Sequence, residues 1–154
     1  QLQIQIIWQC GKKYLNDIEN KFDMNRYPNV RLLAYINDMP AAYAVADLVV
    51  SRAGASSCSE LMVTGTPSIL VPSPNVAGDH QKKNAKSMVE NNAAILLEDS
   101  EVEAKLFEKI NDLIHNDKKL AEMSKSAFRL AKPDAADKIA GDVLDLLQTK
   151  SQNS

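Results

Sequence analysis

The sequence has few cysteines, no long apolar run and no excess of charge of either sign. Only Cys10 and Cys58 occur in 154 residues, which is too few for a disulfide framework and indicates a reducing compartment. No apolar run approaches the roughly 20 residues of a membrane helix, and no secretory leader is visible. A formal net charge of −2 gives no reason to expect nucleic acid as a partner.

Several motifs of known chemistry are also absent. The chain has no G-x-G-x-x-G and no G-x-x-x-x-G-K-[ST], so neither dinucleotide binding nor P-loop chemistry is supported. It has no G-x-S-x-G nucleophile elbow. It has no D-x-D pair of the kind that holds a divalent ion beside a nucleotide sugar, and neither cysteine is framed as a metal ligand. We therefore expect no metal and no cofactor.

The residues that are present are those of a soluble globular domain, 45% hydrophobic and 25% charged. We expect one domain over residues 1–150, followed by a disordered polar tail at 151–154. The chain opens directly on a strand-like run, 2–8, with nothing before it to complete a strand–helix unit. We therefore expect a fragment of a longer protein.

Strand-like and helix-like segments alternate along the chain. The expected strands are 4–9, 30–35, 48–51, 68–71 and 93–97. The expected helices are 12–22, a short one capped by Asn37 or Asp38 with Pro40 in its first turn, 57–64 closed by Gly65, 79–90, one opened by a Ser100–Glu103 capping box, 117–131 and 134–147. This order predicts an α/β fold, a Rossmann-like and mostly parallel sheet with helices on both faces. Ligands of such sheets bind beyond the carboxyl ends of the strands, so the loops 35–39, 51–57 and 72–81 are expected to line one crevice.

The most informative stretch is 48–61, which reads as a buried strand, a loop of small residues and the start of a helix. Gly54 would let the backbone turn tightly, and its small neighbours leave that backbone uncovered. Free amides at a helix start, with the helix dipole, make an anion site. We therefore predict a phosphate at Gly54 and at the amides of Ala55, Ser56 and Ser57. An ordinary strand-to-helix turn is the competing interpretation, and the residues alone leave both open.

Glu60 has two interpretations. It stands three residues after Ser57, which is the spacing of a capping box at a helix start. Its alternative role is to accept hydrogen bonds from the vicinal hydroxyls of a ribose, as acidic residues do in nucleotide sites. One carboxylate can hardly do both.

A second polar group opens the helix expected at 79–90. Gln81 and Asn84 are three residues apart, so their amides share a helix face and offer donors and acceptors to the hydroxyls of a sugar. A solvated polar face is the competing interpretation, favoured on spacing alone. His80 is a candidate base, a ligand to phosphate or sugar, or a surface residue.

Several of these stretches, with their order and spacing, resemble the MurG family over nearly the whole chain. The stretches are Tyr35-Ile36-Asn37-Asp38-Met39, the run from Ala46 to Ala55, Ser59-Glu60, Gly65-Thr66-Pro67 and the run from Asp79 to Ala85. The family comprises bacterial transferases that add N-acetylglucosamine to undecaprenyl-linked muramyl pentapeptide (lipid I to lipid II) in peptidoglycan synthesis. The resemblance implies the carboxyl-terminal, donor-binding half of a two-domain GT-B fold, inverting and metal-independent.

The resemblance also implies roles for individual residues. The backbone at Ile36, flanked by Tyr35, would hold the uracil of UDP. Glu60 would bind the ribose hydroxyls, and the amides from Ala55 to Ser57 would face the diphosphate. The hydroxyls of N-acetylglucosamine would meet a set on the helix expected at 79–90: His80, Gln81 and Asn84.

Two parts of the family pattern are missing from the chain. The G-G-S-x-G loop that touches phosphate would lie before Gln1, and the amino-terminal domain is absent. That domain supplies the acceptor cleft for lipid I, the general base and the apolar patch that associates with the membrane. The full-length protein is accordingly expected to be cytoplasmic and peripheral on the inner face of the plasma membrane, and the isolated chain is expected to be inactive.

Two other functions fit the same residues. One is a non-catalytic nucleotide-sugar-binding subunit that needs a separate acceptor-binding chain, as in the split eukaryotic transferase that makes dolichol-linked chitobiose. The other is a UDP-N-acetylglucosamine 2-epimerase-like domain, which would need acidic and basic catalytic residues that the sequence does not place.

Overall fold

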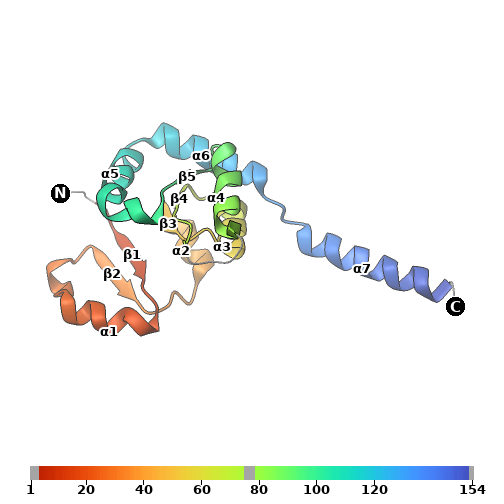
Figure 1. The fold of residues 1–154 in the computed structure, drawn as a ribbon, viewed down its shortest axis with the longest axis horizontal. Coiled ribbons are helices and arrows are strands. Elements are labelled where there is room, and N and C mark those ends of the chain that lie inside the picture. Colours follow the sequence, from red (N-terminus) through yellow and green to blue (C-terminus); the bar gives the residue numbers. More distant parts are fainter. Residues whose placement is uncertain (1–3, 75–78, 153–154) are drawn as a thin grey trace. The chain divides into compact units, whose positions relative to one another are not determined.

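The computed structural model describes residues 4–74 and 79–152, leaving out the side chains after Asp145. Strands and helices alternate along the chain, which confirms the predicted α/β class (Figure 1). The chain divides into two compact units, 1–46 and 47–154, and each is described by itself.

Unit 1 is a parallel strand pair with helical connections. Its elements are β1 (Ile6–Gln9), α1 (Lys12–Lys21), the 3₁₀ turn η1 (Met24–Arg26), β2 (Val30–Leu33) and α2 (Met39–Val45). β1 and β2 run parallel, with Ile6 opposite Val30. Of the two predicted caps of α2, the structure selects Asp38, whose side chain accepts a 3.0 Å hydrogen bond from the amide of Ala41.

Unit 1 has little buried apolar surface. Tyr43 is its one buried residue among those that the structure describes, at 8% exposure. Trp8 on β1 remains 42% exposed and Tyr14 on α1 remains 54% exposed. The strand pair therefore lacks a dense core of its own.

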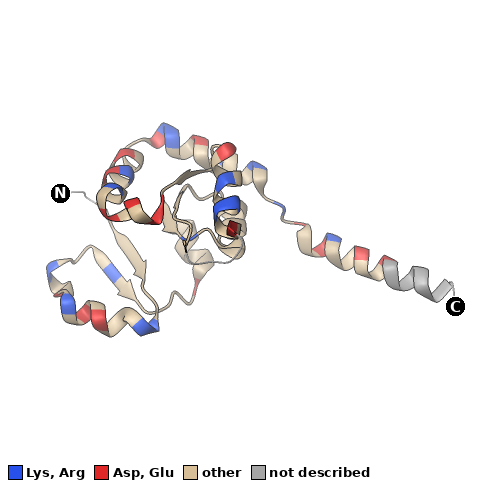
Figure 2. Cartoon of the chain, viewed as in Figure 1, with Lys and Arg blue, Asp and Glu red and all other residues tan. Residues whose placement is uncertain are grey.

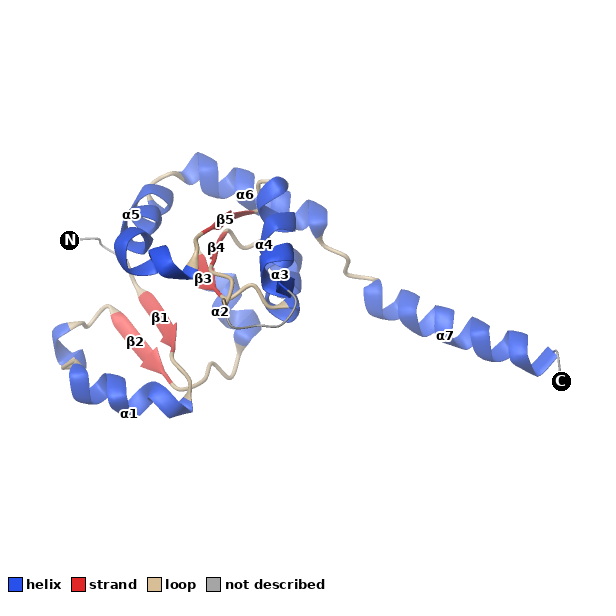
Figure 3. Ribbon diagram, in the orientation of Figure 1, coloured by secondary structure: helices blue, strands red, loops and turns tan. Residues whose placement is uncertain are grey.

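Unit 2 contains a parallel three-stranded sheet with β4 in its centre (Figure 3). Its elements are β3 (Val49–Ser51), α3 (Ala55–Thr64), β4 (Ser68–Leu70), α4 (His80–Glu90), β5 (Ala94–Leu96), the 3₁₀ turn η3 (Asp99–Glu101), α5 (Val102–Ile114), α6 (Asp117–Leu130) and α7 (Ala135–Gln152). The register aligns Val50, Ile69 and Ile95 across the three strands. Connections between consecutive parallel strands pass through α3 and α4, as in βαβ units.

The core of unit 2 is built around β4, where every residue is fully buried. One face of the sheet packs on α5 and α6 through Ile69, Leu97, Leu113 and Met123. Side chains alternate along a strand, so Ser68 and Leu70 point to the opposite face and are covered there too. The strands of this sheet carry no charged residue, whereas the helices carry many (Figure 2). β4 is thus covered on both faces, as the central strand of a parallel sheet is, whereas β3 is not the buried strand that was predicted, because Val50 remains 40% exposed.

The predicted end of α3 at Gly65 is confirmed. Gly65 adopts the left-handed conformation, with φ of 63°, and its amide donates to the carbonyl of Met62. A Cβ at this position would lie 2.1 Å from the ring of Phe128 on α6. Gly65 therefore ends the helix and allows α3 and α6 to come into contact.

The two predicted capping boxes are wrong. α3 begins at Ala55 after an extended Gly54, so Ser57 lies inside the first turn and no side chain caps the helix. Ala55 and Ser56, the small residues before Ser57, already have a helical backbone, so the helix begins two residues earlier than predicted. A 3₁₀ turn likewise precedes α5, so Ser100 lies in that turn and Glu101 is the uncapped N-cap.

α7 continues to Gln152, beyond the predicted end at Leu147. Its apolar residues Ile139 and Val143 are 65% and 50% exposed. No helix in the described part of the chain is both long enough and apolar enough to cross a membrane.

Candidate functional site

Eight of the ten predicted site residues lie in unit 2, on α3 and α4 and beside the carboxyl ends of β3 and β4. Carboxyl ends of parallel strands are where open α/β sheets bind ligands. The other two, Tyr35 and Ile36, follow β2 in unit 1.

The amino terminus of α3 presents free backbone amides. The first backbone bond of the helix runs from the amide of Cys58 to the carbonyl of Gly54, at 2.9 Å. The amides of Ala55, Ser56 and Ser57 come before it and point out of the helix end, and the N-cap residue Gly54 has no side chain to cap them. Ala55 and Ser56 are exposed. This end of a ten-residue helix can receive an anion, because its dipole and its amides act together.

Gly54 acts differently from the sequence-based prediction. Its φ of −63° and ψ of 152° are ordinary extended values, so no tight turn requires glycine here. Among the residues that the structure describes, a Cβ at Gly54 would come within 4 Å of Ser57 Oγ alone, at 3.8 Å. The fold tolerates a side chain at this position, and the remaining reason for glycine is space over the amides of α3.

Gln81 and Asn84 connect α4 to the ends of the strands. Gln81 Oε1 accepts a 2.8 Å hydrogen bond from the amide of Ser73, just after β4. Asn84 Nδ2 donates a 3.1 Å hydrogen bond to the carbonyl of Ala53, just before α3. Both side chains are half-buried, so they are not simply part of a solvated face.

These bonds decide what each amide can offer to a ligand. Gln81 has its carbonyl oxygen engaged and keeps its Nε2 donors. Asn84 has one N–H engaged and keeps Oδ1 as an acceptor. Together they offer donors and an acceptor to neighbouring hydroxyls.

His80 and Glu60 are both exposed. His80 is the first residue of α4 and follows Asp79, which has a left-handed backbone with φ of 52°. Glu60 lies in the second turn of α3. Since no capping box forms, the capping role that competed with a ligand role for Glu60 is removed.

In unit 1, Tyr35 is 61% exposed after the end of β2. The amide of Ile36 donates a 2.8 Å hydrogen bond to Gln9 Oε1. The backbone of Ile36 was predicted to hold the base, and its N–H is already bound to the side chain of Gln9. The sequence analysis did not predict this contact.

Arg52 is a residue of the site that the sequence analysis did not single out. It follows β3 directly, and its Nη1 donates to the carbonyls of Val71 and Pro72 at 3.3 and 3.5 Å. The same nitrogen forms an ion pair with Asp99. A charged residue immediately after an apolar strand was the available signal, but its partner Asp99 lies 47 positions away.

Cys58 lies behind the amide cluster, on the buried side of α3. Burial raises the pKa of its thiol above the usual range. A buried thiol with little thiolate is a poor nucleophile, so Cys58 is a packing residue. Within the described residues, no group of three or more His, Cys, Asp or Glu side chains is arranged to hold a metal ion.

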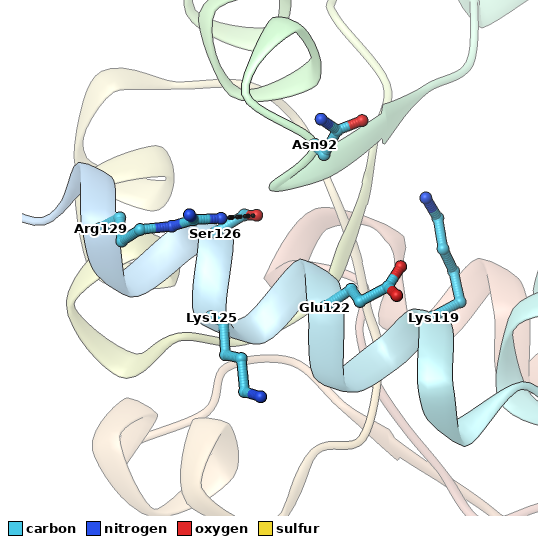
Figure 4. A pocket seen from close by; sticks show the side chains of 6 residues that line it. All are labelled: Asn92, Lys119, Glu122, Lys125, Ser126 and Arg129. Atoms are coloured by element: carbon cyan, nitrogen blue, oxygen red, sulfur yellow. Dashed lines mark hydrogen bonds between the residues drawn. The ribbon is translucent and has the colours of Figure 1, made fainter.

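A separate hollow of about 370 Å³ lies on α6, beside the turn that precedes β5 (Figure 4). Its lining residues are Asn92, Lys119, Glu122, Lys125, Ser126 and Arg129. Arg129 Nη2 donates to Ser126 Oγ at 2.9 Å. The turn before β5 lies at the amino end of that strand, and none of the predicted site residues lines the hollow.

Comparison with known proteins identifies the family of the chain. Residues 1–139 match the glycosyltransferase family 28 C-terminal domain. The chain is 47% identical over 143 residues to a transferase of Salinibacter ruber named UDP-N-acetylglucosamine–N-acetylmuramyl-(pentapeptide) pyrophosphoryl-undecaprenol N-acetylglucosamine transferase. That match covers 93% of the chain and 38% of the relative. A transferase of the same name from Bacteroides thetaiotaomicron is 46% identical, covering 96% of the chain and 40% of the relative.

Solved structures show the same fold. The crystal structure of Acinetobacter baumannii MurG matches with a TM-score of 0.80 and 30% identity, over 97% of this chain and 45% of that one. The glycosyltransferase VinC, solved with dTDP, matches with a TM-score of 0.72, over 97% of this chain and 35% of that one. At 16% identity, that likeness concerns the fold alone. The chain thus spans about two fifths of its curated relatives and belongs to the family of glycosyltransferase family 28 C-terminal domains.

Proposed function

We propose that residues 1–150 are the donor-binding domain of an inverting, metal-independent N-acetylglucosaminyltransferase that uses UDP-N-acetylglucosamine. The observation that carries this proposal is the uncapped amino terminus of α3, with α4 held beside it through Asn84 and Ala53. The amides of such a helix end are suited to an anion, and the amide side chains of α4 are suited to sugar hydroxyls, which supports the proposal. The names of the relatives supply the identity of the donor.

In the proposed complex, the diphosphate lies on the amides of Ala55, Ser56 and Ser57, beneath the open space at Gly54. Glu60 accepts hydrogen bonds from the ribose hydroxyls. Its exposure on α3 and the lack of a capping role support this assignment.

On α4, His80, Gln81 and Asn84 are proposed to meet the N-acetylglucosamine. Gln81 would donate through Nε2, and Asn84 would accept through Oδ1, because their other polar atoms are engaged. The uracil is proposed to bind at Tyr35 and Ile36. Since Gln9 occupies the Ile36 amide, the base would use the carbonyl of Ile36 or displace Gln9.

The proposed chemistry is a single displacement. An acceptor hydroxyl attacks the anomeric carbon and gives up its proton to a general base, which the amino-terminal part of the longer relatives would supply. The bond from the anomeric carbon to UDP breaks at the same time, so negative charge builds up on the leaving diphosphate. The amides and dipole of α3 stabilise that charge, and they are already in place before the reaction.

For the whole protein, we propose synthesis of lipid II from lipid I in peptidoglycan biosynthesis, on the cytoplasmic face of the plasma membrane. The acceptor and the membrane would be bound by the amino-terminal part that the longer relatives have. We expect the 154-residue chain to bind donor without turnover. Formation of product from UDP-N-acetylglucosamine and lipid acceptor by this chain alone would contradict that expectation.

The test of the donor proposal is calorimetric titration of UDP-N-acetylglucosamine and UDP-glucose into the purified chain. Glu60→Ala should weaken binding of UDP by about 1–3 kcal/mol, because a charged acceptor of two hydroxyls is lost. The thermal midpoint of the variant, measured beside the UDP affinity, separates lost binding from lost stability.

The matched control is Glu122→Ala, which removes an exposed glutamate from α6. It should leave UDP affinity unchanged. Unaltered UDP affinity in Glu60→Ala, or equal binding of the two UDP-sugars, would argue against the assigned contacts. Complete absence of UDP binding would argue against the donor domain itself.

A further inference from the structure

The side chain of Arg52 lies across the carboxyl ends of all three strands of unit 2. It starts at the end of β3, bonds to the carbonyls of Val71 and Pro72 after β4, and pairs with Asp99 after β5. Backbone bonds run alongside it, from the amide of Val71 to Ser51 and from the amide of Leu97 to Leu70. Arg52 therefore crosses the edge of the sheet on which the proposed donor site is built.

The turn after β5 also holds α4. Glu98, next to Asp99, forms a 3.6 Å ion pair with Lys82 on the first turns of α4. These two adjacent carboxylates hold two different elements. Asp99 pairs with Arg52, in the loop that leads into α3, and Glu98 pairs with Lys82 on α4. α3 and α4 carry the amides and side chains of the proposed site.

These ion pairs are poorly placed to stabilise the fold as a whole. The side chains of Arg52 and Asp99 are 54% and 37% exposed, and those of Lys82 and Glu98 are 51% and 43% exposed. Exposed ion pairs contribute little to global stability because water screens them. Because these ion pairs lie at the base of the loop 53–57, we expect them to affect ligand affinity instead of global stability. Small displacements of a binding loop change affinity strongly.

We propose that Asp99 is a positioning residue of the nucleotide-sugar site. It holds Arg52 across the strand ends and thereby fixes the loop 53–57, so that the amides of α3 converge on the diphosphate. This inference rests on the proposed function, because it assigns Asp99 a role in the same site. Asp99 is proposed to affect ligand binding through Arg52, without contacting the ligand itself.

The test compares Asp99→Asn and Asp99→Glu with the unaltered chain. Asp99→Asn should weaken binding of UDP about three- to tenfold by calorimetry. It should also speed amide hydrogen exchange in residues 53–57, with little change in the thermal midpoint. Asp99→Glu keeps the charge and should recover most of the UDP affinity.

The matched control is Glu101→Gln. It removes a neighbouring ion pair, Glu101 with Lys105, whose side chains are 39% and 51% exposed. That pair lies within η3 and α5 and does not contact Arg52. UDP affinity and exchange of the loop should be unchanged in this variant.

A double-mutant cycle separates positioning from a general loss of charge. In an Arg52→Met background, Asp99→Asn should have no further effect on UDP binding, because its partner is already gone. Unaltered or tighter UDP binding in Asp99→Asn, or the same loss in Glu101→Gln, would overturn the positioning role while leaving the proposed function standing. Failure of the unaltered chain to bind UDP would overturn both.

Discussion

At the scale of single residues, the hydroxyl of Ser68 is the least well accommodated polar group that the structure describes. Ser68 is fully buried in the central strand β4, and its Oγ has no hydrogen-bond partner within the described residues. Burying such a hydroxyl costs free energy that a methyl group would not. The hydroxyl of Ser68 therefore destabilises the central strand relative to a methyl group at the same position.

Ser68→Ala is expected to raise the free energy of unfolding by about 1 kcal/mol, because it removes a buried unpaired hydroxyl. Urea denaturation should show a higher midpoint with an unchanged slope. Ser126→Ala is the control, since its buried hydroxyl accepts a 2.9 Å hydrogen bond from Arg129. A lower midpoint for Ser68→Ala would mean that its hydroxyl is satisfied in solution.

Capping patterns in the sequence predicted the start of one helix correctly and the start of another incorrectly. The predicted cap at Asn37 or Asp38, with Pro40 in the first turn, located the start of α2, because a cap and its first turn are local in sequence, and the structure selects Asp38. Ser57 and Glu60 had the spacing of a capping box, yet α3 starts earlier at Ala55. Spacing alone does not select which of several small residues begins a helix.

At the scale of elements, α3 is bounded by two glycines with opposite requirements. Gly65 has a left-handed backbone and lies against Phe128, whereas Gly54 has an extended backbone and open space around it. Only the glycine at the carboxyl end of the helix is therefore needed for folding.

Gly65→Ala should lower the free energy of unfolding by at least about 1–2 kcal/mol, the cost of a left-handed backbone for a residue with a Cβ. Crowding against Phe128 adds to this, since the new Cβ would lie 2.1 Å from the ring. Chemical denaturation measures the total, and adding Phe128→Ala should relieve only the crowding part.

Gly54→Ala is the matched control at the other end of α3, where the nearest atom to a Cβ is 3.8 Å away. Its stability should stay close to that of the unaltered chain. Equal losses for the two substitutions would contradict the distinction between the two helix ends.

At the scale of the whole molecule, the two units differ in how much they bury. Unit 2 has a fully buried strand and a core that includes Leu97 and Met123. Unit 1 has Tyr43 as its one buried residue among those described, and its strand β1 is exposed along its whole length. Local stability follows buried contacts, so the units should open with different free energies.

Hydrogen exchange followed by mass spectrometry should show this difference. Amides of β4 are expected to exchange at least tenfold more slowly than amides of β1, in line with the range of local opening free energies in proteins. The donor should be absent in this measurement, so that ligand binding does not contribute. Equal protection of the two strands would contradict a weaker unit 1.

The sequence by itself determined the order of strands and helices, the start of α2 after a cap at Asn37 or Asp38, and the end of α3 at Gly65. These features depend on backbone preferences and contacts within about one turn, which local residues specify. The tertiary structure alone decided how the amides of Gln81 and Asn84 are used and where Arg52 binds. Their partners Ser73, Ala53 and Asp99 lie 8, 31 and 47 positions away, and only the order of parallel strands brings them together.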